Sequence, residues 1–101
     1  MNNHLTALYL LLKNDSYRFD PKSCRSANVS VMDAKLLRWL FFDEHNNSEV
    51  SKNFGTGLPN KLLKQGLVEN LLGTQDTEQT NIWKLSADGL ELLKTITGMK
   101  S

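Results

Sequence analysis

The sequence has few residues of the kinds that form disulfides or hold metals. It contains one cysteine, Cys24, and two histidines, His4 and His45. One cysteine cannot form an internal disulfide, which fits a protein of the reducing cytoplasm. The two histidines and Cys24 show no metal-ligand spacing. We therefore expect a cytoplasmic protein that holds no metal and no other cofactor.

Catalytic motifs are also missing. Gly55-Thr56-Gly57 lies between two predicted helices, whereas a phosphate-binding loop follows a strand. Asp43 and Glu44 are adjacent carboxylates, but neighbours in sequence point in different directions on a helix. No serine or cysteine has a recognisable base beside it. The sequence therefore indicates a protein that is not an enzyme.

Neither a strong net charge nor a long apolar run is present. Twelve basic residues oppose 11 acidic ones, so the formal net charge is +1 and any nucleic-acid binding must depend on local patches. The apolar run Leu5–Leu12 is far shorter than the roughly 20 residues of a membrane helix. It also lacks the basic flank and cleavage site of a signal peptide. We expect one domain with no membrane contact.

Helical periodicity begins at the N-terminus. Residues 2–13 place an apolar stripe on one side of a helix, and further apolar residues widen that stripe to most of the circumference. A helix that is apolar nearly all round is buried on several sides. A second copy of the chain is a natural cover, so we expect a homodimer built mainly from this helix, together with residues 88–95. The stripe and its extension are Leu5, Ala7, Leu8, Tyr9, Leu10, Leu11 and Leu12.

The middle of the chain alternates polar and helical segments. Residues 14–30 are polar and contain Asp20-Pro21, which predicts a loop with room for a short strand or a helical turn. Ser30 and Asp33 have capping-box spacing, so a helix should run from there to about Asp43. Ser48 is the expected cap of a helix over 49–54, and Pro59 suits the first turn of a helix over 59–65.

Turn and cap signals continue to the C-terminus. Gly66 stands where a helix C-terminal glycine belongs, and two strands over 67–74 and 81–85 should form a hairpin. Ser86 is a good N-cap for a helix that buries Leu90 and Leu93. The predicted core leucines are Leu36, Leu40, Leu62, Leu63, Leu67, Leu85, Leu90 and Leu93.

The order helix, Gly66-Leu67-Val68, hairpin and the motif L-S-x-x-G-x-x-L-L at 85–93 resembles the end of a winged helix-turn-helix domain. The nearest likeness is to MarR-like transcriptional regulators, over about residues 30–96. The resemblance implies a mainly α fold with a small β-hairpin (α+β) in one winged-helix domain, 1–101. Within it, 1–13 would be the dimerisation helix, 14–30 a loop and 31–96 the winged-helix core.

The resemblance implies a small DNA-binding transcriptional regulator that acts as a dimer on double-stranded DNA. The two helices around the glycine turn would read the duplex, and residues 48–66 carry three lysines against one glutamate, a balance of +2. Lys suits phosphates and guanine, and Asn or Gln suits adenine. The same lysines also fit an ordinary solvated helix face. The expected DNA-binding residues are Lys52, Thr56, Asn60, Lys61, Lys64 and Gln65.

The wing departs from the family pattern. MarR-like wings carry basic residues at the tip, whereas this tip contains Asp76 and Glu78, and residues 67–91 hold five acidic residues and one lysine, a balance of −4. Carboxylates are repelled by phosphates. The alternative is therefore a protein-interaction module, such as a phage- or plasmid-type modulator or inhibitor, whose acidic wing binds a protein. An ordinary solvated turn and an adaptor role in a larger assembly also remain open.

Three further features have competing interpretations. Arg18, Lys22 and Arg25 fit either a phosphate-binding arm or a solvated loop. The tryptophans at 39 and 83 fit core packing better than base stacking. Cys24 has the chemistry of a redox sensor, but the sequence has no resolving cysteine, which disfavours that role.

Overall fold

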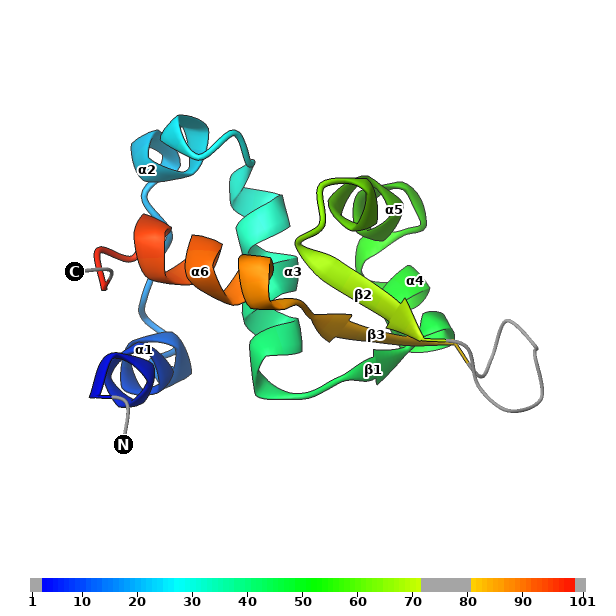
Figure 1. The fold of residues 1–101 in the computed structure, drawn as a ribbon, viewed down its shortest axis with the longest axis horizontal. Helices are drawn as coiled ribbons and strands as arrows, with labels where there is room; N and C mark the ends of the chain where they lie inside the picture. The colour runs from blue at the N-terminus through cyan, green and yellow to red at the C-terminus, as the bar shows by residue number, and fades with distance from the viewer. Residues whose placement is uncertain (1–2, 72–80, 100–101) are drawn as a thin grey trace.

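The computed structural model describes residues 3–71 and 81–99. The helices and strands follow one another along the chain as Figure 1 labels them. They are α1 (Asn3–Lys13), α2 (Pro21–Ser26), α3 (Val31–Phe42), β1 (His45–Asn46), α4 (Asn47–Phe54), α5 (Gly57–Lys64), β2 (Val68–Leu71), β3 (Ile82–Leu85) and α6 (Ala87–Ile96).

The architecture is mainly helical with a small antiparallel sheet, which confirms the expected α+β class. The strands lie in the order β1-β3-β2. Val68 is opposite Leu85 in the β2–β3 pair, and His45 is opposite Trp83 in the β1–β3 pair. The predicted hairpin strands are therefore present, although β2 is described only to Leu71. Residues 72–80, with the acidic tip, lie outside the described residues.

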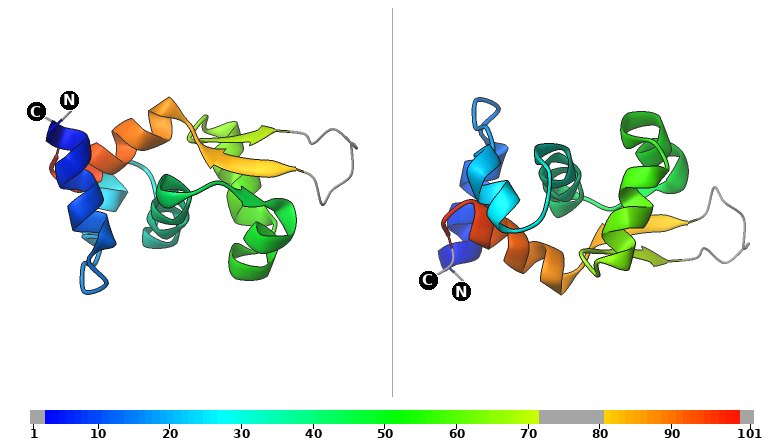
Figure 2. Two further views of the ribbon diagram at one scale, coloured as in Figure 1. Left: turned by 90° about the horizontal axis from the view of Figure 1, so that it is seen from below. Right: turned by 90° about the horizontal axis from the view of Figure 1, so that it is seen from above.

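Helix α3 runs through the middle of the molecule. Figures 1 and 2 show α1, α2 and α6 at one end, and α4, α5 and the sheet at the other. The predicted capping box is confirmed: Ser30 accepts a hydrogen bond from the Asp33 backbone N–H, and the Asp33 carboxylate accepts one from the Ser30 N–H. The helix ends at Phe42 with Asp43 as its C-cap, close to the predicted end at about Asp43. Its position makes α3 the scaffold that joins the two ends.

The core combines residues from both ends around α3. Leu36, Leu40, Leu62 and Leu93 are buried as predicted, and Leu67, Leu85 and Leu90 pack partly buried against them. The prediction was wrong for Leu63, which is 38% exposed. Leu62 and Leu63 are neighbours on α5, so only one of them can face inward. The buried apolar residues are Leu8, Leu12, Phe19, Cys24, Val29, Ala34, Leu36, Leu37, Leu40, Val50, Leu62, Val68, Trp83, Leu93 and Ile96.

Three helix starts differ from the prediction. Helix α5 begins at Gly57, two residues before Pro59. Residues 14–30 contain the six-residue helix α2, which Asp20 caps by accepting from the Ser23 N–H, with Pro21 in its first turn. Proline is common at this position of a helix. Asp20-Pro21, from which a loop was predicted, therefore marks the start of a helix. Helix α4 starts at Asn47 because Asn46, rather than Ser48, caps it.

The last helix follows the prediction closely. Ser86 caps α6 by accepting a hydrogen bond from the Gly89 N–H at 3.0 Å, and its hydroxyl donates to the Gly66 carbonyl at 2.6 Å. Leu93 and Ile96 are buried. Ser86 therefore joins the start of α6 to the end of α5. No helix in the described ranges is long and apolar enough to cross a membrane.

Candidate nucleic-acid interface

A tight turn joins α4 to α5. Gly55 ends α4 with φ +80°, and its N–H donates to the Ser51 carbonyl at 2.9 Å. This backbone conformation favours glycine because it has no Cβ. Thr56 follows, and α5 begins at Gly57. The predicted glycine turn therefore brings two short helices together beside the sheet (Figure 1).

Helix α5 has a buried side and a polar side. Pro59 and Leu62 are buried. The helix ends in two backbone hydrogen bonds, from the Gly66 N–H to the Leu63 carbonyl and from the Leu67 N–H to the Leu62 carbonyl, both 3.0 Å. This pair is the Schellman ending, and Gly66 has the required positive φ of 76°. The end of α5 is thereby fixed at the start of β2.

The predicted contact residues all lie on this two-helix unit. Lys52 is in α4, Thr56 is in the turn, and the others are in α5 or immediately after it. Every one of them is exposed. The structure thus places all six on the exterior of the two-helix unit, and this set is called the polar surface below: Lys52, Thr56, Asn60, Lys61, Lys64 and Gln65.

These residues differ in how free their side chains are. The Asn60 amide donates to the Thr56 carbonyl at 2.8 Å, which leaves its oxygen and one N–H available. Within the described residues, Lys52 and Lys64 make no side-chain hydrogen bond or ion pair. Their ammonium groups are the two positive charges of this surface that remain available to an anion.

Lys61 is already paired inside the molecule. Its ammonium lies 2.8 Å from Asp33 Oδ2, and the Asp33 side chain has no exposure whereas that of Lys61 is 50% exposed. From the sequence, Asp33 was predicted only as part of the capping box of α3. A carboxylate inside the run Val31-Met32-Asp33-Ala34 was a signal that it would be buried and need a cation. The predicted contact of Lys61 with DNA remains a prediction, and Asp33 competes for the same ammonium.

Aromatic and amide groups fix α4 on the sheet. Trp83 is buried, as expected, and its indole N–H donates to the Asn47 side-chain oxygen at 3.0 Å. The Trp39 ring stacks on the His45 imidazole at 3.6 Å between centroids with an interplanar angle of 7°. The Phe54 ring, at the end of α4, also packs against Trp39, with 5.3 Å between the ring centroids. The start and the end of α4 are therefore both held, which limits how far the turn can move.

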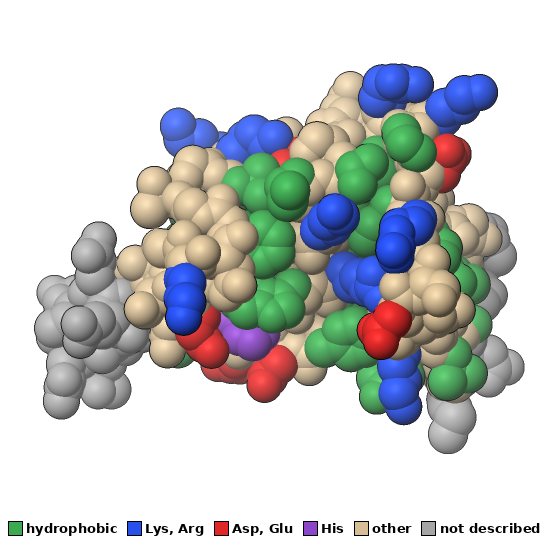
Figure 3. Space-filling model, turned by 180° about the vertical axis from the view of Figure 1, so that it is seen from behind, with side chains coloured by type: hydrophobic (Ala, Val, Ile, Leu, Met, Phe, Trp, Pro, Cys, Tyr) green, Lys and Arg blue, Asp and Glu red, His purple; other side chains and the backbone are tan. Residues whose placement is uncertain are grey.

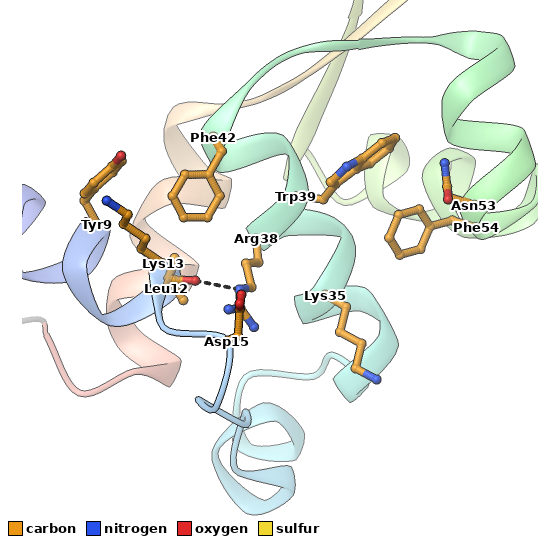
Figure 4. A pocket seen from close by; sticks show the side chains of 10 residues that line it. All are labelled: Tyr9, Leu12, Lys13, Asp15, Lys35, Arg38, Trp39, Phe42, Asn53 and Phe54. Atoms are coloured by element: carbon orange, nitrogen blue, oxygen red, sulfur yellow. Dashed lines mark hydrogen bonds between the residues drawn. The ribbon is translucent and has the colours of Figure 1, made fainter.

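An open groove runs beside the two-helix unit. Figure 4 shows Tyr9 and Phe42 on one side, Trp39 and Phe54 on the other, and Arg38 between them. The groove has a volume of about 660 Å³. It is bounded by Tyr9, Leu12, Lys13, Asp15, Lys35, Arg38, Trp39, Phe42, Asn53 and Phe54.

Three cations and one carboxylate line this groove. Arg38 donates to the carbonyls of Leu12 and Asn14, both at 2.9 Å, so it holds the segment after α1 in place. Lys13 and Lys35 are exposed. The groove therefore offers aromatic faces next to positive charge, with Arg38 largely engaged in holding the chain.

Charge is unevenly distributed over the surface. Figure 3 shows a face on which Lys and Arg side chains surround and interrupt a band of hydrophobic side chains. The described part of the wing is less basic, because Glu69 on β2 lies 3.9 Å from the Lys84 ammonium on β3 and both are about half exposed. The positive potential for an anionic partner thus comes from the helices and not from the strands.

Metal and thiol chemistry have little support in the described residues. No group of three or more His, Cys, Asp or Glu side chains there could hold a metal ion. Burial, together with the negative charges of Asp20 and Asp33, raises the pKa of the Cys24 thiol. A raised pKa keeps the thiol protonated and unreactive, which disfavours a redox-sensor role for Cys24.

Comparison of the chain with protein-family models, curated proteins and solved structures found no match.

Proposed function

We propose that this chain is a winged-helix DNA-binding regulator that acts as a dimer in the cytoplasm. The observation that carries the proposal is α5: an eight-residue helix behind a tight glycine turn, with its apolar side on the core and its polar side exposed. In helix-turn-helix proteins the second helix of such a unit enters the major groove, and the first crosses the backbone. Helices α5 and α4 would take these two roles.

The roles of the side chains follow from their surroundings. Lys52 and Lys64 have free ammonium groups and would contact phosphates. Asn60 keeps an oxygen and an N–H available, which is what pairing with an adenine edge requires. Thr56 and Gln65 flank the helix and would add polar contacts. The ribbon of β2 and β3 would lie beside the duplex, with its acidic residues away from the backbone.

The substitutions that test this proposal are Asn60→Ala and Lys64→Met. Fluorescence anisotropy with a set of duplexes of different sequence is the measurement. Lys64→Met should weaken binding to all duplexes, and Asn60→Ala should change the order of preference among them. Lys61 is a poor choice for this purpose, because its removal leaves the buried Asp33 unpaired. Unchanged binding in both variants would refute the proposed interface.

A second candidate function is binding to a protein through the acidic wing. Net charge near zero and the balance of −4 over residues 67–91 favour it. This module would show no duplex affinity at low salt, whereas a DNA-binding protein has its highest affinity there. The same anisotropy experiment therefore separates the two functions.

A further inference from the structure

Asp33 has an environment that capping alone does not require. Its side chain is fully buried in the first turn of α3. Oδ2 accepts hydrogen bonds from the Ser30 N–H at 2.9 Å and from the Lys61 ammonium at 2.8 Å. Oδ1 has no hydrogen-bond partner among the described residues. The carboxylate is thus shared between the start of α3 and the middle of α5.

Stability alone does not account for this pair. Burying a carboxylate removes its hydration, and among the described residues the hydrogen bonds that replace it are made to Oδ2. Two apolar side chains of similar size often stabilise a protein as well as a buried ion pair does. Unlike apolar contact, a hydrogen-bonded ion pair fixes the relative position of its two partners, because the ammonium must lie close to one carboxylate oxygen.

We infer that Asp33 is a positioning residue for duplex binding, because it holds Lys61 and thereby sets the orientation of α5 against α3. This inference rests on the proposed function. Lys61 lies between Asn60 and Lys64 in the helix that would enter the major groove. With its ammonium on Asp33, Lys61 fixes the helix, and the phosphate contacts fall to Lys52 and Lys64.

Asp33→Asn separates positioning from a direct phosphate contact. Asparagine can still accept from the Ser30 N–H, but it lacks the charge that holds Lys61. If Lys61 were a phosphate contact, the variant would release it and remove a negative charge, so duplex binding would stay the same or tighten. Positioning predicts the opposite: affinity should fall about fivefold or more, within the usual range of coupling between parts of a protein. Equal or tighter binding by folded Asp33→Asn would overturn the inference.

Two controls keep this result specific. Glu91→Gln removes an exposed carboxylate on α6, and its duplex affinity should match or slightly exceed that of the parent chain. Lys61→Arg keeps a cation opposite Asp33 and should retain most of the affinity. Circular dichroism at the assay temperature must show each variant folded.

Lys61→Met provides a second route if Asp33→Asn does not fold. Positioning predicts weaker binding with an unchanged dependence of log K on log salt. A phosphate contact predicts that the magnitude of this slope falls by about 0.9 for each lysine lost. A slope that falls in this way would overturn the inference.

Urea unfolding tests the pair without DNA. Lys61→Met should lower the unfolding midpoint, and the neutral pair Asp33→Asn with Lys61→Met should recover much of the loss. If the two substitutions act independently, the link between α3 and α5 does not exist. If the link is present but the parent chain binds no duplex, the proposed function fails and the positioning role fails with it.

Discussion

At the residue scale, Gly89 occupies a place where no side chain fits. A Cβ on this residue of α6 would collide with the Leu67 carbonyl and lie 2.6 Å from Leu85 Cδ1. Glycine ordinarily weakens a helix, so its presence here reflects the close approach of α6 to the chain before β2. Ser86, three residues earlier, makes two hydrogen bonds across the same contact, from its hydroxyl to the Gly66 carbonyl and from its backbone N–H to the Leu67 carbonyl.

Gly89→Ala should therefore lower the free energy of unfolding by about 1–3 kcal/mol, because the added methyl overpacks the contact. Gly57→Ala is the matched control. A Cβ at Gly57 would meet nothing within 4 Å, and alanine should leave stability unchanged or raise it by about 0.4–1 kcal/mol. Urea denaturation measures both, and a Gly89→Ala variant as stable as Gly57→Ala would contradict the packing.

Neighbouring leucines on α5 give a second prediction at this scale. Leu62 is fully buried and Leu63 is 38% exposed. Leu62→Ala should cost about 2–5 kcal/mol of unfolding free energy, whereas Leu63→Ala should cost about 0.5 kcal/mol or less, as exposed substitutions usually do. Urea unfolding of the pair decides which leucine faces the core, and a larger loss for Leu63→Ala would contradict the structure.

At the element scale, caps and glycines were the most predictable features. Ser30, Ser86 and Gly66 could be assigned from sequence because each satisfies backbone groups of its own helix. β1 was not predicted, since two residues carry no strand periodicity and their pairing with β3 depends on residues far along the chain. The burial of Asp33 has a signal in its own segment, but its pairing with Lys61 in particular has none, because 28 residues separate the two.

Helix α2 allows a test of local opening. It holds Cys24 against the core, where the thiol is 1% exposed and its pKa is raised mainly by burial. Ellman's reagent should therefore react with the native thiol on the order of a hundredfold more slowly than with the unfolded chain, an opening free energy of about 3 kcal/mol.

Asp20→Ala removes the cap of α2 and should accelerate this reaction severalfold without changing global unfolding much. The Asp20 carboxylate accepts from the Ser23 hydroxyl, a hydrogen bond that lowers its pKa. Asp15→Ala is a control on an exposed carboxylate outside α2. If native Cys24 reacts as quickly as the unfolded thiol, α2 does not protect it.

At the scale of the whole molecule, α1 leaves a broad apolar surface exposed. Leu8 and Leu12 face the core, whereas Leu5, Tyr9 and Leu10 are exposed, Leu10 by 61%. The sequence predicted this helix and its excess of apolar residues, but only the structure separates the two sides. Leu8 lies on the apolar stripe of α1 and so looked like a dimer contact, but it is buried in the core of its own chain.

Leu10→Glu should convert the predicted homodimer to a folded monomer, because an unpaired charge at a buried interface is costly. Sedimentation velocity at micromolar concentration measures the change. Met32→Glu is the control, since Met32 is 51% exposed on α3 and its substitution should leave the dimer intact. A parent chain that sediments as a strict monomer would contradict the prediction.

We propose that the polar surface of α4 and α5 binds duplex DNA through phosphate contacts from Lys52 and Lys64. The most direct measurement is duplex affinity between about 50 and 200 mM salt. If these lysines contact phosphates, log K falls linearly with log salt, and Lys52→Met and Lys64→Met each reduce the magnitude of the slope by about 0.9. No binding at about 50 mM salt, or a slope that neither substitution changes, would contradict it.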